Sequence, residues 1–305
     1  MNIKRVLNLI FLFPRASRLP FLCGSLISVG LGTALAYRES GTFAWSLFLL
    51  TLTGISGAHL AVNLLNDYYD YLYGADPSHP PRPLSGGSQV IQEGLETPDE
   101  YLAQAMLCGS VAVACALCLA WLAGPLVLAL ALLGGLLGYS YSARPLILSW
   151  RGLGELTAGF CFGPMVVAGS FYVQAGYISP LALLLSLVPG ALISLLLMIN
   201  QYPDYRDDLQ AGKKNLVVRL GPQRSLPLLY LLLLAAFITL IPGLRLLPAS
   251  PPGCAALAGL IPAAAAAGIL SASKGKPHPG NKPGKLILLS YTLTLGLLVL
   301  GIYLQ

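Results

Sequence analysis

Charge is scarce in this sequence. Only 10% of the 305 residues are Asp, Glu, Lys or Arg, whereas 56% are hydrophobic, and the mean hydropathy is +0.73. Soluble domains carry charge on about a quarter of their residues. The shortage therefore excludes an ordinary soluble domain and indicates a membrane protein. Short strands of alternating hydrophobicity, which a membrane β-barrel needs, are also missing, so the spans are predicted to be helices.

Long apolar runs fill most of the chain, and each is close to the roughly 20 residues that cross a hydrocarbon core. They predict an all-α fold, a polytopic membrane bundle of about nine transmembrane helices in a lipid bilayer. The segment before the first run carries Lys4 and Arg5 but lacks a small-residue cleavage site, so we interpret it as a helix on the membrane surface. The expected spans are residues 16–36, 42–64, 102–122, 124–141, 155–175, 179–200, 225–245, 250–271 and 285–304.

The basic residues lie in the connections between apolar runs, so the net charge of +6 indicates membrane topology and no nucleic-acid partner. If the N-terminus is cytoplasmic, every Lys and Arg except Arg38 and Arg245 falls on the cytoplasmic side. An odd number of spans then sends Gln305 to the opposite side. The sequence shows no organelle-type leader, and we expect an integral protein of a bacterial inner membrane.

Cysteine and histidine give no sign of a disulfide framework or a zinc site. All six cysteines fall in apolar runs. Cys115 and Cys118 form a C-x-x-C pattern in the middle of a span, with no His or acid nearby, which indicates packing. The three histidines lack metal-ligand spacing. His59 is interpreted as a structural residue of its helix, and the alternative is that its side chain points into the same cavity as Asn63, one turn later.

Acidic residues are rare but concentrated, because ten of the twelve lie in two polar segments, 66–101 and 201–224. Around the start of each segment the pattern N-x-x-x-D-Y-x-D occurs, first at residues 63–70 and again at 200–207. Positions i, i+4 and i+7 share one face of a helix, so each copy presents an amide and two carboxylates in a single stripe. Such a concentration of charge in an apolar chain marks the functional site.

The repeated pattern also predicts an internal duplication. Helices one to four (16–141) and five to eight (155–271) would be parallel repeats, followed by a final helix (285–304), in a single domain that spans residues 1–305. Chance similarity between two short helices is the simpler alternative. Four helices separate the two motifs, so both would face the cytoplasm in the orientation above.

Magnesium prefers six oxygen ligands and commonly takes one or two carboxylates, waters and substrate phosphates. Two facing stripes of carboxylates can therefore hold two Mg²⁺ ions together with a diphosphate. The alternative is that the acids only solvate helix ends, but their clustering in two matching motifs favours metal binding. The candidate catalytic and metal-binding residues are Asp67, Asp70, Asp204 and Asp208, with Asn63 and Asn200 as neutral oxygen donors.

Basic and aromatic residues accompany the acids. Lys213 directly follows the second acidic cluster and is interpreted as a cation for phosphate, whereas Lys214, Arg219 and Arg224 fit topology anchors equally well. Between the fourth and fifth spans, tyrosines, Trp150, arginines and Glu155 are expected on the same face as the acids, where they can contact diphosphate or an acceptor. Tyrosine and tryptophan at this depth are equally typical of the membrane interface. The remaining substrate-binding candidates are Arg18, Asn66, Asp76, Arg82, Tyr139, Tyr141, Arg144, Arg151 and Asp207.

As a set, these motifs resemble the UbiA superfamily of intramembrane aromatic prenyltransferases, most of all its 1,4-dihydroxy-2-naphthoate polyprenyltransferase branch. The last three helices share only their hydrophobicity with the family. Two positions depart from it: Gly74 stands where the family often has Asp, and Pro145 stands where some members have a Lys four residues after a Tyr. The residues that carry the resemblance are 66–70 with Gly74 and Asp76, 85–88, 141–145, 151–155, 204–213 and 218–221.

The resemblance implies a helical bundle with a central cavity open to lipid, two Mg²⁺ ions held by the acidic motifs, and a polyprenyl diphosphate as donor. It implies an aromatic acceptor, with 1,4-dihydroxy-2-naphthoate favoured, in menaquinone synthesis. The same chemistry on 4-hydroxybenzoate, homogentisate, haem or a glycerol phosphate lipid is the alternative. A cation-coupled transporter is more distant, because transporter sites lie near the middle of the membrane.

Overall fold

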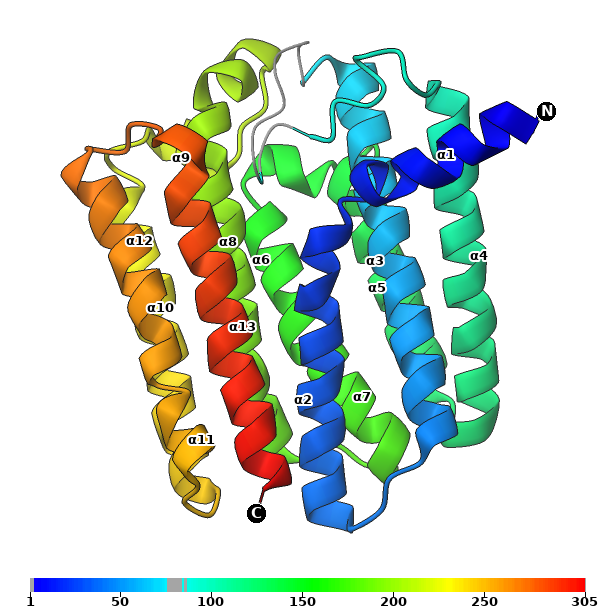
Figure 1. Cartoon of the computed structure of the whole chain (residues 1–305), viewed down its shortest axis with the longest axis vertical. Helices are drawn as coiled ribbons and strands as arrows, with labels where there is room; N and C mark the ends of the chain where they lie inside the picture. Colours follow the sequence, from blue (N-terminus) through cyan, green and yellow to red (C-terminus); the bar gives the residue numbers. More distant parts are fainter. Residues whose placement is uncertain (1–2, 76–83, 85–86, 305) are drawn as a thin grey trace.

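The protein is built of helices in the computed structural model, which describes residues 3–75, 84 and 87–304. Within those ranges no residue is in a strand, as the sequence predicts. The longer helices run side by side, and α1 lies across one end of them (Figure 1). The helices are α1 (Ile3–Ala16), α2 (Leu22–Ser40), α3 (Trp45–Tyr73), α4 (Pro98–Ala123), α5 (Leu126–Ser142), α6 (Gly154–Phe160), α7 (Val166–Ala175), α8 (Pro180–Ala211), α9 (Leu216–Leu220), α10 (Leu226–Leu246), α11 (Pro251–Ala255), α12 (Ile261–Ala272) and α13 (Lys282–Tyr303).

Eight helical segments in the described chain are long and apolar enough to cross a membrane, which confirms the predicted membrane bundle. Two of them are composite. The π-helical turn η3 (Cys161–Met165) joins α6 to α7, and the 3-10 turn η4 (Ala258–Leu260) lies between α11 and α12. The remaining expected span, 124–141, is α5, whose 17 residues are apolar but shorter than the other eight.

The two helices that carry the acidic motifs end in the same way. α3 stops at Gly74 with φ 71° and α8 stops at Gly212 with φ 78°, a left-handed conformation that glycine adopts without a Cβ penalty. Each cap amide donates back to the last turn, to carbonyls that include those of Asp70 and Asp208. Both motifs therefore occupy the final turns of a long helix, directly before a chain reversal.

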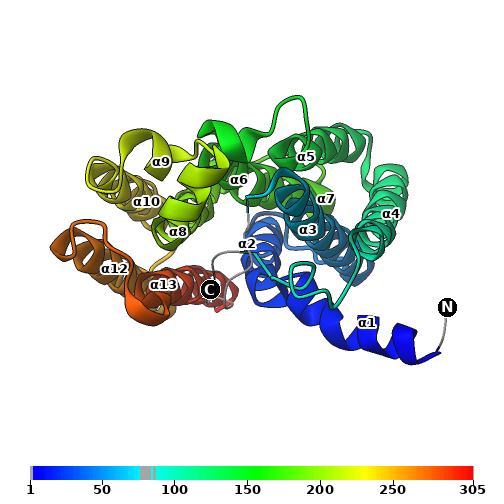
Figure 2. The same cartoon turned by 90° about the horizontal axis from the view of Figure 1, so that it is seen from above.

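Helix α8 forms the centre of the bundle. In its most apolar stretch 72% of the residues are buried inside the protein, against 17% in the peripheral α4. Viewed from above, α3, α4 and α5 lie to the right of α8, whereas α10, α12 and α13 lie to its left and below it (Figure 2). The main apolar core, which includes Leu192, Ile199 and Leu240, packs α8 against α2, α10 and α13. Whether the two halves are true repeats stays a prediction.

Small residues let α6 and η3 approach α8 closely. A Cβ on Gly163 would lie 2.5 Å from the Ser186 carbonyl oxygen and 2.9 Å from the Gly190 Cα, so only glycine fits there. Close approach is common between membrane helices, because lipid provides no hydrophobic force to drive them together. It brings Glu155, at the start of α6, within hydrogen-bond reach of Gln201 in α8.

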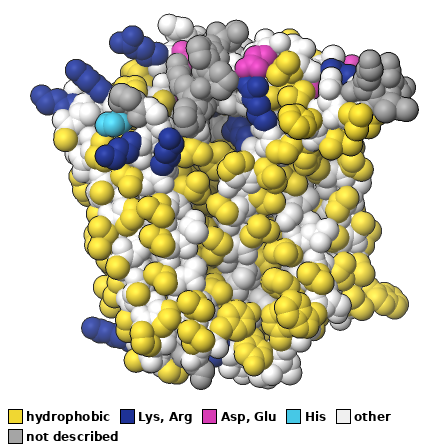
Figure 3. Space-filling view, in the orientation of Figure 1, with side chains coloured by type: hydrophobic (Ala, Val, Ile, Leu, Met, Phe, Trp, Pro, Cys, Tyr) yellow, Lys and Arg dark blue, Asp and Glu magenta, His cyan; other side chains and the backbone are white. Residues whose placement is uncertain are grey.

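Charged side chains gather at the end of the molecule where α3 and α8 terminate, whereas hydrophobic side chains cover the middle of the face shown in Figure 3. An apolar belt with charge beyond it is the surface of a protein that spans a bilayer. Together with the eight apolar helices, it shows an integral membrane protein.

The surface helix expected before the first span is α1. Its exposed apolar residues recur at helical spacing, because Leu7, Ile10, Phe11 and Pro14 all point away from the bundle. The opposite side packs on a small core between α3, α4 and the loop before α4, where Leu12 and Phe13 contact buried residues such as Tyr101. The arrangement leaves one apolar stripe available to lipid.

Candidate active site

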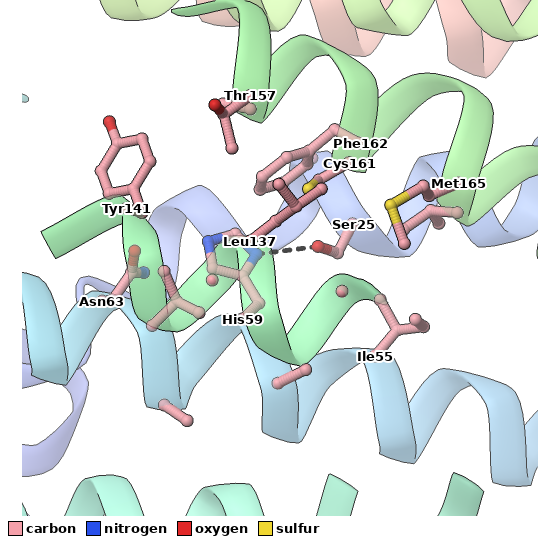
Figure 4. Close-up of a pocket in the computed structure, with 18 of the residues that line it drawn as sticks. Ser25, Ile55, His59, Asn63, Leu137, Tyr141, Thr157, Cys161, Phe162 and Met165 are labelled. Carbon is pink, nitrogen blue, oxygen red and sulfur yellow. Dashed lines mark hydrogen bonds between the residues drawn. The ribbon is translucent and has the colours of Figure 1, made fainter. Parts of the chain in front are cut away.

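A cavity of about 630 Å³ lies among α2 to α8, and its lining is mostly apolar. Ile55, Leu137 and Met165 face it from α3, α5 and η3 (Figure 4). Charged and amide side chains enter the lining mainly from the two motifs and from the segment after α8, at the charged end of the bundle. They are Arg18, Asn63, Asn66, Asp70, Asn200, Gln201, Asp204, Asp208, Lys213 and Asn215.

Asp67, in the first motif, is 4% exposed and is held at both oxygens. Arg18, from the corner between α1 and α2, donates to Oδ1, and the backbone N–H of Ser88 donates to Oδ2 at 2.9 Å. A buried carboxylate is costly unless it is paired and hydrogen-bonded, and these contacts meet both needs. Three distant chain segments therefore meet at Asp67, which, unlike Asp70, lies outside the cavity lining.

Asp70 lies one turn further along α3 and is 2% exposed. The indole N–H of Trp150 donates to its Oδ1 at 3.0 Å. Lys213 and Asn66 donate to its Oδ2 at 3.1 Å and 3.3 Å. Three donors from three parts of the chain thus orient the Asp70 carboxylate at the edge of the cavity.

Asp208, at the end of α8, is 4% exposed. The Asn215 amide donates to its Oδ2 at 2.6 Å, and the Lys213 ammonium lies 3.6 Å from its Oδ1. Because the same ammonium also contacts Asp70, one cation joins the first motif to the second. The two acidic motifs, far apart in sequence, therefore share one polar site.

The other motif residues take different positions. Asp204 is half-buried and lines the cavity, whereas Asp207 is half-buried and lies outside the lining. The Asn63 amide donates to the Ser17 carbonyl at 2.9 Å, and the Asn200 oxygen accepts from the Asn281 amide at 3.0 Å. Both asparagines line the cavity, but each also ties its helix to a neighbouring part of the fold.

Residues 25–282 match the UbiA prenyltransferase family. The chain belongs to this family. It is 29% identical to the 1,4-dihydroxy-2-naphthoate octaprenyltransferase of Bacillus subtilis over 76% of this chain and 72% of that protein. It is 33% identical to the Escherichia coli enzyme of the same name over 68% of this chain and 67% of that protein. The resemblance inferred from the motifs is confirmed, and the protein is a prenyltransferase.

Other relatives are longer than this chain. It is 29% identical to UbiA prenyltransferase domain-containing protein 1 of Xenopus tropicalis over 70% of this chain, but it spans only 61% of that protein. The fold is similar to that of a UbiA homologue from Archaeoglobus fulgidus bound to GPP and Mg²⁺, with a TM-score of 0.64. That likeness covers 96% of this chain and 98% of the other at 17% identity, and therefore supports the UbiA fold alone.

Several predicted contacts of this UbiA chain fall at the edge of the site. Tyr141 points into the cavity from α5 (Figure 4), whereas Tyr139 is half-exposed and meets Tyr69 edge-on at 6.3 Å. Arg144 lies 5.3 Å above the Tyr73 ring, and Arg151 donates to the Pro145 carbonyl at 2.9 Å. Both arginines are exposed and outside the cavity lining. Asp76 and Arg82 lie outside the described residues.

Three polar contacts of the UbiA site were not predicted from the sequence. Asn215 caps α9, because its side-chain oxygen accepts from the Val218 N–H, and the same amide donates to Asp208. An Asn before an apolar run is an N-cap signal, which could have revealed the cap but not its second partner. Trp150 and Ser88 showed no local signal that their N–H groups would reach the first motif.

Glu155 is buried beside the site, whereas His59 is half-buried and belongs to the cavity lining. The Ser25 hydroxyl is 2.8 Å from the His59 Nδ1, and Phe162 meets the imidazole edge-on at 4.9 Å (Figure 4). These contacts support the structural interpretation of His59. Gln201 donates to the Glu155 Oε1, so Glu155 lies behind a cavity-lining amide rather than in the lining itself.

The donor set of the site fits a hard divalent cation. Four carboxylates and two amides supply only oxygen ligands, which Mg²⁺ prefers. In the part of the chain that the structure describes, no three His, Cys, Asp or Glu side chains converge closely enough to hold a metal ion by themselves. The buried carboxylates are instead satisfied by Arg18 and Lys213. Ligands from water and diphosphate would therefore have to complete any Mg²⁺ shell.

Proposed function

We propose that this protein transfers a prenyl group from a polyprenyl diphosphate to 1,4-dihydroxy-2-naphthoate in menaquinone synthesis. The observation that carries the proposal is the Lys213 ammonium between Asp70 and Asp208, at the polar end of an otherwise apolar cavity. A diphosphate needs that polar end, and an isoprenoid tail needs the apolar remainder. The two bacterial relatives, both 1,4-dihydroxy-2-naphthoate octaprenyltransferases, support the naphthoate acceptor.

Asp67, Asp70, Asp204 and Asp208, with Asn63 and Asn200 as further oxygen donors, would hold one or two Mg²⁺ ions. When bound, Mg²⁺ supplies positive charge that stabilises the departing diphosphate. Lys213 adds a point charge for the same oxygens, as lysines do at phosphate sites. Because these charges are held in a protein cavity and not in bulk water, their stabilisation of the leaving group is strong.

In the proposed reaction, the prenyl group is transferred inside the cavity. The allylic C–O bond breaks with its electron pair on the diphosphate, and the electron-rich ring forms the new C–C bond. For a naphthoate acceptor, the ionised carboxyl group leaves as CO₂ and its electron pair restores the aromatic ring. Apolar wall residues such as Ile55, Leu137 and Met165 exclude the water that would otherwise react with the allylic carbocation formed when the C–O bond breaks. Tyr141, which points into the cavity, is placed to contact the acceptor.

The decisive experiment measures consumption of a radiolabelled polyprenyl diphosphate by membranes that contain the protein. We expect Mg²⁺-dependent transfer with 1,4-dihydroxy-2-naphthoate and little with 4-hydroxybenzoate, homogentisate, haem or a glycerol phosphate lipid. Preference for one of those acceptors would overturn the naphthoate assignment while leaving the donor chemistry intact. Transfer that survives complete chelation of divalent ions would overturn the Mg²⁺ assignment.

The site is also proposed to face the cytoplasm of a bacterial inner membrane, with the N-terminus inside and the C-terminus outside. Support comes from the concentration of basic residues at the motif end of the bundle. Labelling of single cysteines, introduced near Lys276 and near Arg245, by a membrane-impermeant reagent tests the orientation. Labelling of the Lys276 site from the outside of intact cells would contradict it.

A further inference from the structure

Ser88 is a junction between the first motif, α4 and α1. Its backbone N–H donates to the Asp67 Oδ2 at 2.9 Å, and its hydroxyl is 2.7 Å from the Tyr101 hydroxyl. Its carbonyl accepts from the Arg15 Nε at 3.0 Å. Every polar group of this buried residue is therefore engaged, each with a different part of the chain.

The local sequence does not explain the backbone conformation around Ser88. Gly87 has φ 68°, and Gln89 has φ 63°, a left-handed conformation that is unfavourable for a residue with a side chain. Such conformations persist where surrounding contacts over-determine them. The Ser88 N–H therefore needs outside contacts to stay aimed at Asp67.

Arg15 provides the strongest of these contacts. While its Nε binds the Ser88 carbonyl, Nη1 and Nη2 bind the two Glu93 oxygens at 2.9 Å and 2.6 Å. The planar guanidinium thus closes the loop from residue 88 to residue 93. Arg15 is also in the last turn of α1, three residues before Arg18, which binds the other oxygen of Asp67.

We infer that Arg15 is a positioning residue for Asp67: it holds Ser88, and the Ser88 N–H fixes the orientation of the Asp67 carboxylate. This inference rests on the proposed function, in which Asp67 is a Mg²⁺ ligand. Ligand orientation is commonly set by partners outside the metal shell, and their loss typically lowers metal affinity about 10- to 100-fold. A residue of the surface helix would thereby control the site without touching substrate.

The chain contains a matched control. Arg5, at the other end of α1, also binds a glutamate and a backbone carbonyl: its Nε donates to Glu100, in the first turn of α4, at 2.7 Å, and its Nη1 donates to the Leu95 carbonyl of the loop at 3.0 Å. Both arginines therefore fasten α1 to the bundle by the same chemistry. The Arg15 partner, Ser88, contacts Asp67 directly, whereas the Arg5 partner, Leu95, lies seven residues further along the chain.

The first test is amide hydrogen exchange on the full chain in lipid nanodiscs, read by mass spectrometry over residues 87–97. Arg15→Ala should raise exchange at residues 88–93 about tenfold, an effect of about 1.4 kcal/mol, because the loop loses its closing contact. Arg5→Ala should raise exchange only near residues 94–97. Equal exchange patterns in the two variants would overturn the inference.

The second test is the Mg²⁺ concentration that gives half-maximal prenyl transfer. Arg15→Ala should raise it about tenfold with the acceptor KM changed less than about twofold, and Arg15→Lys should fall between, because lysine cannot make both contacts of the guanidinium. Arg5→Ala should stay within about twofold of the wild type. Matched thermal unfolding midpoints show that the variants are folded.

The two proposals fail in different ways. If the wild type shows no Mg²⁺-dependent transfer, the proposed function fails, whereas the exchange comparison still decides whether Arg15 holds Ser88. If the wild type is active and the Arg15 and Arg5 variants need the same Mg²⁺ concentration, the positioning role alone fails. In that case Arg15 only anchors α1.

Discussion

The two acidic motifs share a pattern and a helix end, yet they are surrounded differently. In the first motif both Asp67 and Asp70 are buried, and their donors come from distant segments that include the α1 corner, the loop at Ser88 and the connection at Trp150. At the second motif neither Asp204 nor Asp207 is buried; the equally buried acid is Asp208, the next residue, and its partners Asn215 and Lys213 come from the segment that directly follows it.

This difference shows that a repeated pattern specifies a helix face but not its electrostatic environment. The first motif depends on contacts that form only when the whole bundle is assembled. The surroundings of Asp208, directly after the second motif, are organised locally, around the turn at Gly212 and the cap of α9. Lys213 connects the two, because it belongs to the second segment but also satisfies Asp70.

The largest expected effect comes from removing one carboxylate from each motif. Asp67→Asn and Asp204→Asn should each lower prenyl transfer by about 10²- to 10³-fold, because charge stabilisation of the leaving group is the main catalytic contribution. Asp207→Asn is the control and should lose far less, because Asp207 is the motif acid that is neither buried nor part of the cavity lining. The measurement is radiolabelled transfer in membranes with matched protein levels, and near-normal turnover in Asp67→Asn would remove it from the metal site.

Removing the Lys213 ammonium should distinguish its contribution to folding stability from its contribution to catalysis. Lys213→Met leaves the buried Asp70 and Asp208 carboxylates without their common ammonium, and should lower the free energy of unfolding by about 3 kcal/mol. Lys214→Met, at the exposed neighbouring residue, should change the free energy of unfolding little. The thermal unfolding midpoint in detergent measures both. Adding Asp70→Asn to Lys213→Met should restore part of the stability but no activity, and a stable Lys213→Met protein would argue against the bridge.

The equivalent asparagines should also differ. Asn200→Ala removes the acceptor of the buried Asn281 amide and should cost about 1–3 kcal/mol of stability. Asn63→Ala removes only a donor to the Ser17 carbonyl and should cost less, while its effect on the Mg²⁺ requirement should be the larger of the two. Parallel unfolding and Mg²⁺ titrations compare them. Identical behaviour would mean that the motifs are equivalent despite their surroundings.

The smallest expected effect is the loss of the Arg15–Glu93 contact at acidic pH. The hydrogen bond from Arg15 holds the pKa of the Glu93 carboxyl below its ordinary value of about 4.3. The contact is therefore fully present at neutral pH and is lost as the pH falls through that lowered pKa. Hydrogen exchange over residues 88–93, taken relative to the intrinsic amide rate at each pH, should rise in the wild type only as the pH falls through that lowered pKa, whereas Glu93→Gln should exchange faster already at neutral pH. An equal rise in both proteins would assign the acid response to another group.

Much of this protein was predictable from its sequence because the physical signals were strong and local. Apolar runs of membrane length predicted the spans, and glycine after Asp70 and after Asp208 ends both motif helices with a turn that residues with side chains avoid. These features depend on neighbours in the chain, so a single sequence suffices to read them.

The partners of the acids were decided by the tertiary structure. Nothing near Ser88, Trp150 or Asn281 in the chain shows that they would meet residues of the motifs. Conversely, Arg144 and Arg151 had the right chemistry, yet they lie outside the cavity lining. A hydrogen bond is made only within about 3 Å and in a suitable direction. Whether two distant groups satisfy that condition depends on how the helices pack, which residue type and spacing alone do not specify.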